Sequence, residues 1–229
     1  HVNNKVNPVE DLETIKTEIA LSDIETIQKK LEKSKKKLLS QKEVEILKKS
    51  LEVLNNGNDL HSFEHPSKAF LNQIGLLSLK PKIIVCNVDE ATLKDGNDHT
   101  LNIMKTYSKE KVITICADIE DQLSSLTGDE KFKFMREIGL EKMGINKLIK
   151  EGYDLLSLET FFTSGKEESR AWTVRKNTSA PKAASVIHTD FEKNFIRVEA
   201  VDTSDFIKFG STEKCKENGK LRIEGKDYI

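Results

Sequence analysis

Two short apolar runs constrain the fold of this chain more than any other feature. Residues 83–86 read Ile-Ile-Val-Cys and residues 112–116 read Val-Ile-Thr-Ile-Cys, which is the length and β-branched character of buried strands. A helical pattern lies between them, at about residues 98–108, and further helical patterns fill residues 119–153. Because parallel strands need a crossover connection, this order predicts two parallel strands of an α/β sheet.

The N-terminal segment has a different period. From about residue 11 to residue 55, apolar residues recur at helical spacing, and the later sets keep nearly heptad spacing. Each apolar stripe is narrow and charged residues fill the faces between, so two helices packed along their stripes would bury both. We therefore predict an antiparallel helical coiled-coil hairpin, with its turn near residues 35–41, as a domain of residues 1–65.

The C-terminal segment, residues 157–229, predicts a small α+β domain that resembles a β-grasp. Two strand patterns come first, an alanine-rich helical pattern follows, and further strand patterns end the segment. Its aromatic residues lie in alternating or helical apolar patterns. We expect a core that includes Trp172, Phe191, Phe195 and Phe206. Residues 66–156 are then the α/β domain.

Composition excludes several classes of protein. The 229 residues include 37 basic and 38 acidic ones, and the net charge of −1 argues against a surface that is basic throughout. No apolar run approaches the roughly 20 residues of a membrane span, so we expect a cytoplasmic protein without a membrane partner. The three cysteines are far apart, which predicts reduced thiols. The first residue is His1, and we expect a piece of a longer protein.

One stretch is strongly basic. Nine lysines lie between Lys29 and Lys49, against three glutamates. Positive charge on a projecting helical arm favours a polyphosphate partner such as RNA, so we predict a salt-sensitive contact with RNA through this stretch. The alternative is a solubilising helical surface, since lysine is also a good helix former. The predicted contact residues are Lys33, Lys35, Lys36 and Lys37.

Phosphate and metal chemistry have no counterpart in the sequence. The phosphate-binding loop G-x-x-x-x-G-K-[ST] is absent, and residues 139–144, which come nearest, lie between helical patterns. The run His-Ser-Phe-Glu-His at residues 61–65 has the spacing of a zinc motif, but Pro66 follows at once and would end a helix. We expect no metal site and no catalytic residue, so this chain alone should not catalyse phosphoryl transfer.

The residues that follow the two predicted strands could recognise a purine base. Asn87 and Glu90 follow the first predicted strand, and residues 116–118, Cys-Ala-Asp, follow the second. In nucleotide-binding α/β folds the ligand lies at the carboxyl ends of parallel strands, where these side chains would meet. An amide and a carboxylate can bond the edge of a purine. The same residues also make a good helix N-terminus, which is the competing interpretation.

Together these segments resemble the YchF subfamily of Obg-like P-loop ATPases, over essentially the whole chain. Lys-Pro-Lys-Ile-Ile-Val-Cys-Asn-Val-Asp-Glu, ending at Glu90, resembles the family's base-recognition motif, in which N-x-x-E replaces the N-K-x-D of GTPases. Residues 111–123 resemble the following base-contact loop, and residues 170–229 the ubiquitin-like TGS domain, whose last strand would follow Ile229. The resemblance assigns purine contacts to Asn87, Val88, Glu90, Cys116, Ala117 and Asp118.

The resemblance also implies a function for the intact protein. It would be a monomeric P-loop NTPase of the TRAFAC class that hydrolyses ATP with Mg²⁺, GTP less well, and binds the ribosome or RNA. The magnesium ligands, the phosphate loop and the switches would precede His1 and are absent from this chain. The alternative is a non-catalytic RNA- or ribosome-binding adaptor that uses a degenerate nucleotide fold as a scaffold.

Overall fold

The fold is that of a computed structural model, which describes residues 6–34, 39–62, 68–165 and 167–229. The chain divides into two compact units, residues 1–151 and residues 152–229, and each is described by itself. The boundary predicted at residue 65 falls outside the described ranges. The three-part division therefore remains a prediction.

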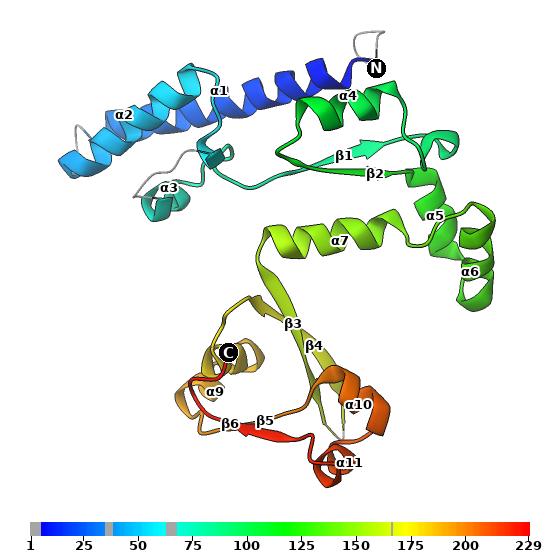
Figure 1. The fold of residues 1–229 in the computed structure, drawn as a ribbon. Helices are drawn as coiled ribbons and strands as arrows, with labels where there is room; N and C mark the ends of the chain where they lie inside the picture. The colour runs from blue at the N-terminus through cyan, green and yellow to red at the C-terminus, as the bar shows by residue number, and fades with distance from the viewer. Residues whose placement is uncertain (1–5, 35–38, 63–67, 166) are drawn as a thin grey trace. The chain divides into compact units, whose positions relative to one another are not determined.

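Two long helices open the first unit. Helix α1 (Pro8–Ser34) and helix α2 (Gln41–Asn55) lie side by side, as Figure 1 shows, and bury Ile27, Ile46 and Leu47 in a shared core. Ser40 starts α2 with a capping box: its Oγ accepts the Glu43 amide N–H at 3.3 Å, and the Glu43 carboxylate accepts the Ser40 amide at 2.8 Å. The helices form where the sequence places them, while their assignment to a coiled-coil insertion remains a prediction.

A buried carboxylate joins helix α1 to the segment that leads into the sheet. Asp23 is 2% exposed and accepts the amide N–H groups of Leu77 and Ser78, each at 2.8 Å, and the Ser78 hydroxyl at 2.6 Å. The short helices η1 (Leu60–Ser62) and α3 (Lys68–Ile74) flank this point. Leu71, on α3, belongs to the core of α1 and α2, so these three helices share one core.

The parallel pairing predicted for the two apolar runs is confirmed. Strand β1 (Ile83–Asn87) pairs in parallel with strand β2 (Lys111–Ile115), in register from the pair Ile83 and Lys111 to the pair Asn87 and Ile115. The crossover contains η2 (Glu90–Thr92) and helix α4 (Asp98–Thr106). Helix α4 covers one face of the pair, where Ile84, Ile103 and Tyr107 form a core that also contacts helix α1.

Three helices follow β2. They are α5 (Ala117–Ser125), α6 (Gly128–Glu137) and α7 (Gly144–Leu155). Helix α5 packs on α6 through a core of Ile119, Leu123, Met135 and Met143. Cys116, the residue between β2 and α5, belongs to this core, so the core lies next to the end of β2.

The second unit contains two antiparallel strand pairs. Strands β3 (Leu158–Ser164) and β4 (Ser169–Arg175) form one pair, and β5 (Val198–Ala200) and β6 (Arg222–Glu224) form the other. Helices α8 (Ala180–Ile187) and α9 (Thr189–Lys193) lie between β4 and β5, and helices α10 (Thr203–Phe209) and α11 (Thr212–Glu217) lie between β5 and β6. In the described residues the two pairs are separate sheets, so the mixed α/β character is shown and the single β-grasp sheet stays a prediction.

The aromatic core predicted for this unit is only partly right. Trp172, Phe195 and Phe206 are half-buried, but Phe191 is 51% exposed. Phe191 lies on the five-residue helix α9, which is too short to bury a full apolar stripe. Its ring contacts His188 instead, with the ring centroids 5.8 Å apart.

None of the helices in the described part of the chain is both long enough and apolar enough to cross a membrane. All three cysteines have free thiols, and Cys116 and Cys215 are buried.

A hydroxyl–carboxylate contact between helices α1 and α4 predicts a pH dependence of stability. The Tyr107 hydroxyl donates to Glu13 at 2.5 Å, and burial together with this bond raises the pKa of Tyr107 to about 12. The unfolded pKa is about 10, so the stabilisation is complete below pH 10 and is lost as the pH rises through 12. We expect a loss of about 1 kcal/mol, small because Glu13 is solvated.

The measurement is the free energy of unfolding in denaturant at pH 8 to 12 for the protein and for Tyr107→Phe. Lysines and the other tyrosines titrate in both proteins, so only the difference between the two curves reports Tyr107. Parallel curves would show that the contact contributes nothing.

Candidate nucleotide-base site

The carboxyl ends of β1 and β2 meet, as the sequence predicts. The Oδ1 atom of Asn87, the last residue of β1, accepts the amide N–H of Ala117 at 2.9 Å. Ala117 is the first residue of helix α5, and the first amides of a helix have no partner within it, so Asn87 supplies one. One residue further, the Val88 amide donates to the Ile115 carbonyl at 2.9 Å. Asn87 therefore fixes the loop after one strand to the loop after the other.

An open pocket of about 440 Å³ lies at this point. Three of its lining residues were predicted from the sequence, Glu90, Cys116 and Asp118. The pocket thus contains residues from both strand ends, which are 26 residues or more apart along the chain. Whether they contact a base remains a prediction at this stage.

The other three lining residues were missed by the sequence analysis. They are Asp89, Asp121 and Gln122. A periodic signal was available for two of them, because Asp121 and Gln122 follow Asp118 by three and four residues on helix α5 and so share its face. Asp89 precedes η2 and makes no side-chain cap hydrogen bond, which leaves its carboxylate to the pocket.

The remaining predicted residues lie beside the pocket and do not line it. Val88 is 9% exposed, and its side chain packs inward. The resemblance assigns a purine contact to Ala117, and its amide N–H donates to Asn87. Asn87 is exposed, and its Nδ2 has no hydrogen-bond partner among the residues that the structure describes. Its amide N–H groups are therefore available to a ligand.

Charge defines what this pocket can accept. Four of its six lining residues carry carboxylates, Asp89, Glu90, Asp118 and Asp121. An ionised carboxylate only accepts hydrogen bonds, so the pocket suits donors such as ring imino and exocyclic amino groups. It disfavours phosphate groups, which carry the same charge. Nearby, burial raises the pKa of the Cys86 thiol, so this thiol is less reactive than a free one.

Glu120, on helix α5, connects this helix to the start of helix α7. Its Oε1 accepts the amide N–H of Gly144 at 2.6 Å, at the positively polarised start of helix α7. A Cβ atom at position 144 would lie 2.8 Å from this oxygen and 2.9 Å from Cγ2 of Ile115. Only glycine allows this approach, which links the end of β2, helix α5 and helix α7.

The predicted RNA contacts are described only in part. Lys33 lies exposed near the end of helix α1. Lys35, Lys36 and Lys37 lie outside the described residues. Lys29 and Lys49 form ion pairs with Glu25 and Glu45 of their own helices. The other described lysines of this stretch are exposed, and they are Lys30, Lys42 and Lys48.

The described ranges contain no group of three or more histidine, cysteine, aspartate and glutamate side chains that could hold a metal ion. Of the motif at residues 61–65, residues 63–65 fall outside these ranges. His61 itself approaches the Leu79 carbonyl, with Nδ1 at 3.3 Å.

A parallel strand pair with polar residues converging at its carboxyl end is the arrangement at which α/β proteins bind nucleotides. A family model described as "YchF-GTPase_C: Protein of unknown function (DUF933)" matches residues 158–229. The chain is 40% identical to the "Ribosome-binding ATPase YchF" of Bacillus subtilis (strain 168) and 39% identical to that of Escherichia coli O157:H7, and both matches cover the whole chain. It belongs to the YchF family.

A solved structure supports this assignment over the same extent. The structure of the Schizosaccharomyces pombe YchF GTPase matches the whole chain and 65% of its own length, with a TM-score of 0.84 and 29% sequence identity. The chain covers 66% of the Bacillus subtilis relative and 65% of the Escherichia coli one, just under two thirds.

Proposed function

We propose that this chain supplies the base-recognition site and a ribosome-contacting arm of an ATPase that acts in translation in the cytoplasm. The observation that carries the first part is the Asn87–Ala117 hydrogen bond, which joins two strand ends beside a carboxylate-lined pocket. The names of the relatives support the second part, since they are ribosome-binding ATPases. The protein would act as a monomer.

The pocket fits the base of a nucleotide and does not fit its phosphates. Glu90 would face the Watson–Crick edge of the purine, and Asn87 would bond the ring through Nδ2. Asp118 would accept a hydrogen bond from a further N–H group of the base, and Cys116 would form part of the pocket wall. Val88 and Ala117 would support the loops from behind, as their contacts indicate. The exocyclic amino group of adenine supplies the donor that carboxylates require.

Phosphoryl transfer would depend on residues outside this chain. A phosphate loop motif is absent from residues 1–229, and positioning and charge stabilisation of the transferred group require such a loop and Mg²⁺. In the intact protein Mg²⁺ and ATP would be the cofactor and substrate, held by other residues, and this chain alone would be inactive. The rival proposal is a non-catalytic ribosome-binding adaptor. Finding G-x-x-x-x-G-K-[ST] in the gene upstream of His1 would exclude it.

Base selection is tested by Glu90→Gln in the intact protein. A carboxylate accepts two bonds from guanine, which presents two donors, whereas a carboxamide matches the acceptor and donor of adenine. One hydrogen bond is worth about 1–3 kcal/mol in such a site. We therefore expect the affinity for ATP relative to GTP to rise about tenfold, measured by titration with labelled nucleotides.

The matched control is Asp95→Asn. Asp95 is an exposed acid five residues away that does not line the pocket, and its replacement changes the charge equally. If Glu90→Gln leaves the ATP to GTP ratio at that of the control, Glu90 does not face the base.

The ribosome contact is assigned to the basic ends of helices α1 and α2. Lys33, Lys42 and Lys48 are exposed there, and the sequence between the helices adds Lys35, Lys36 and Lys37. Contacts to phosphate release counterions, so the affinity should fall steeply with salt.

Replacing Lys33, Lys35, Lys36 and Lys37 by glutamine tests this contact. Glutamine keeps helix propensity but removes four charges, and each lost phosphate contact lowers the slope of log affinity against log salt by about 0.7–0.9. We expect weaker ribosome co-sedimentation and a shallower slope. The control variant replaces four exposed lysines elsewhere, Lys105, Lys109, Lys133 and Lys142. Equal slopes for the two variants would assign the basic stretch a solubilising role only.

A further inference from the structure

Strand β2 has one paired edge and one open edge. Among the described residues it pairs only with β1. The backbone groups of a strand point alternately to its two sides, and the Ile115 carbonyl accepts from Val88 on the β1 side. The groups of Ile113 point the same way, so those of Val112 and Thr114 point to the open edge. Neither has a backbone partner there in the described part of the chain.

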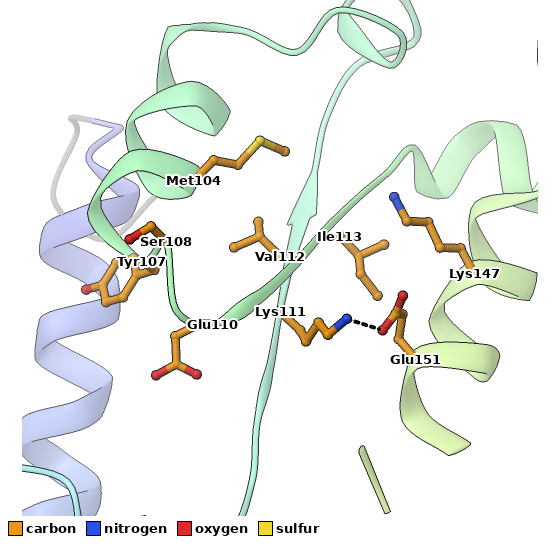
Figure 2. A pocket seen from close by; sticks show the side chains of 9 residues that line it. All are labelled: Met104, Tyr107, Ser108, Glu110, Lys111, Val112, Ile113, Lys147 and Glu151. Atoms are coloured by element: carbon orange, nitrogen blue, oxygen red, sulfur yellow. Dashed lines mark ion pairs between the residues drawn. The ribbon is translucent and has the colours of Figure 1, made fainter. Parts of the chain in front are cut away.

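A second pocket, of about 360 Å³, lies along this open edge (Figure 2). Val112 and Ile113 are neighbours in a strand, so their side chains point to opposite faces of the sheet. Both line the pocket, which therefore lies at the edge of the strand and not on one face. Helix α4 supplies one wall through Met104, and helix α7 supplies the other through Lys147.

The two walls differ in character. On the α4 side, Met104 is 41% exposed and Val112 is half-buried, and these two residues give the wall an apolar part. Ser108 and Glu110 also line the pocket and make its end near the start of β2 polar. On the α7 side, Lys147 is exposed and has no ion-pair partner among the described residues, and Figure 2 draws no ion pair between it and the other residues that line the pocket. Lys111 is different, because its ammonium is paired with Glu151 at 3.0 Å. The open edge thus has Met104 and Val112 on one face, with Glu110 near the start of the strand, and the unpaired cation Lys147 on the other face.

We propose that the open edge of β2 binds an extended peptide segment of a partner protein as an added strand. The backbone groups of Val112 and Thr114 supply the hydrogen bonds of β-strand addition. Side chains of the added strand alternate between the two faces, so one set meets Met104 and the other meets Lys147. The segment therefore alternates apolar and acidic side chains. This site lies apart from the proposed base site, at the opposite end of β2.

Charge favours such a peptide segment over a second copy of the chain as the strand added to this edge. On the α7 side, β2 itself carries Lys111, Ile113 and Ile115, so a second β2 strand would bring no carboxylate to Lys147. The edge also lacks proline, which blocks strand addition in many proteins. An acidic, alternating segment satisfies both the backbone and Lys147.

The test uses a blocked, fluorescein-labelled peptide of sequence Val-Glu-Val-Glu-Val-Glu-Val and the intact protein. We expect saturable binding by fluorescence anisotropy, and slower hydrogen exchange at the Val112 and Thr114 amides when the peptide is present. The Ile113 amide faces β1 and should change little. Lys147→Glu should weaken binding about tenfold, whereas Lys150→Glu, an exposed lysine that does not line the pocket, should leave it unchanged.

Three results would overturn the proposal. One is the absence of saturable binding up to about 1 mM peptide, which is the weak limit of useful affinity. Another is equal binding of a peptide with alternate N-methyl groups, since that peptide cannot form the ladder. The third is slow exchange of Val112 and Thr114 without peptide, because the edge would then be paired within the protein or with a second copy.

Discussion

We expect the replacement of Asp23 by alanine to lower the free energy of unfolding of the first unit by about 4 kcal/mol. The carboxylate is 2% exposed and accepts three hydrogen bonds from Leu77 and Ser78. Its removal leaves the amide and the hydroxyl of Ser78, which is 9% exposed, without their partner, and each such buried group costs about 1–3 kcal/mol. The effect is larger than that of a lost surface ion pair, because Asp23 and Ser78 are both buried.

The measurement is the denaturant midpoint of the protein, with Glu18→Ala as the matched control. Glu18 is an exposed acid of the same helix, so its loss changes charge and helix propensity without touching the loop. Asp23→Asn should fall between the two, since one acceptor oxygen remains. Equal stability of the Asp23 and Glu18 variants would contradict the anchoring role.

The second large effect is expected for Leu123→Ala. Leu123 is fully buried between helices α5 and α6, beside Met135 and Met143. Truncation of a buried leucine to alanine costs 2–5 kcal/mol, about 3 kcal/mol at a typical site, because a cavity remains. Since α5 also carries Asp118, we expect weaker nucleotide binding by the intact protein, in addition to a lower melting temperature.

Ser125→Ala is the control for this variant. Ser125 is exposed at the end of the same helix, and its hydroxyl bonds only to a nearby carbonyl. A Leu123→Ala protein as stable as this control would show that α5 and α6 do not depend on their shared core. Normal nucleotide affinity in a destabilised but folded protein would instead show that the base site does not require a rigid α5.

The features that could be predicted from sequence depend on short-range patterns. The parallel pair followed from the order of strand, helix and strand, and the meeting of Asn87 with Ala117 followed from the parallel pair itself. The helices α1 and α2 followed from their apolar spacing. Each of these predictions needs only the sequence of one helix or strand and a general rule for how that element pairs or packs with its neighbours.

The features that escaped prediction depend on contacts between distant residues. Asp23 bonds a loop 54 and 55 residues further along the chain, and a single acid on a helix carries no sign of this. Gly144 faces Glu120 because two helices approach closely, which no local pattern encodes. The exposure of Phe191 likewise follows from how little of the short helix α9 is packed, and apolar periodicity does not report that.

The Asn87–Ala117 hydrogen bond makes the proposed base site depend on folding. Because the bond joins two groups of the protein itself, it orders both loops, and a nucleotide need not supply the entropy of ordering them. The same bond closes only when β1 and β2 are paired, so the site is present in the folded molecules alone. A variant that is half unfolded therefore binds with half the apparent affinity, and by mass action a saturating nucleotide restores its fold. A raised melting temperature with ATP would then report site occupancy in any destabilised variant.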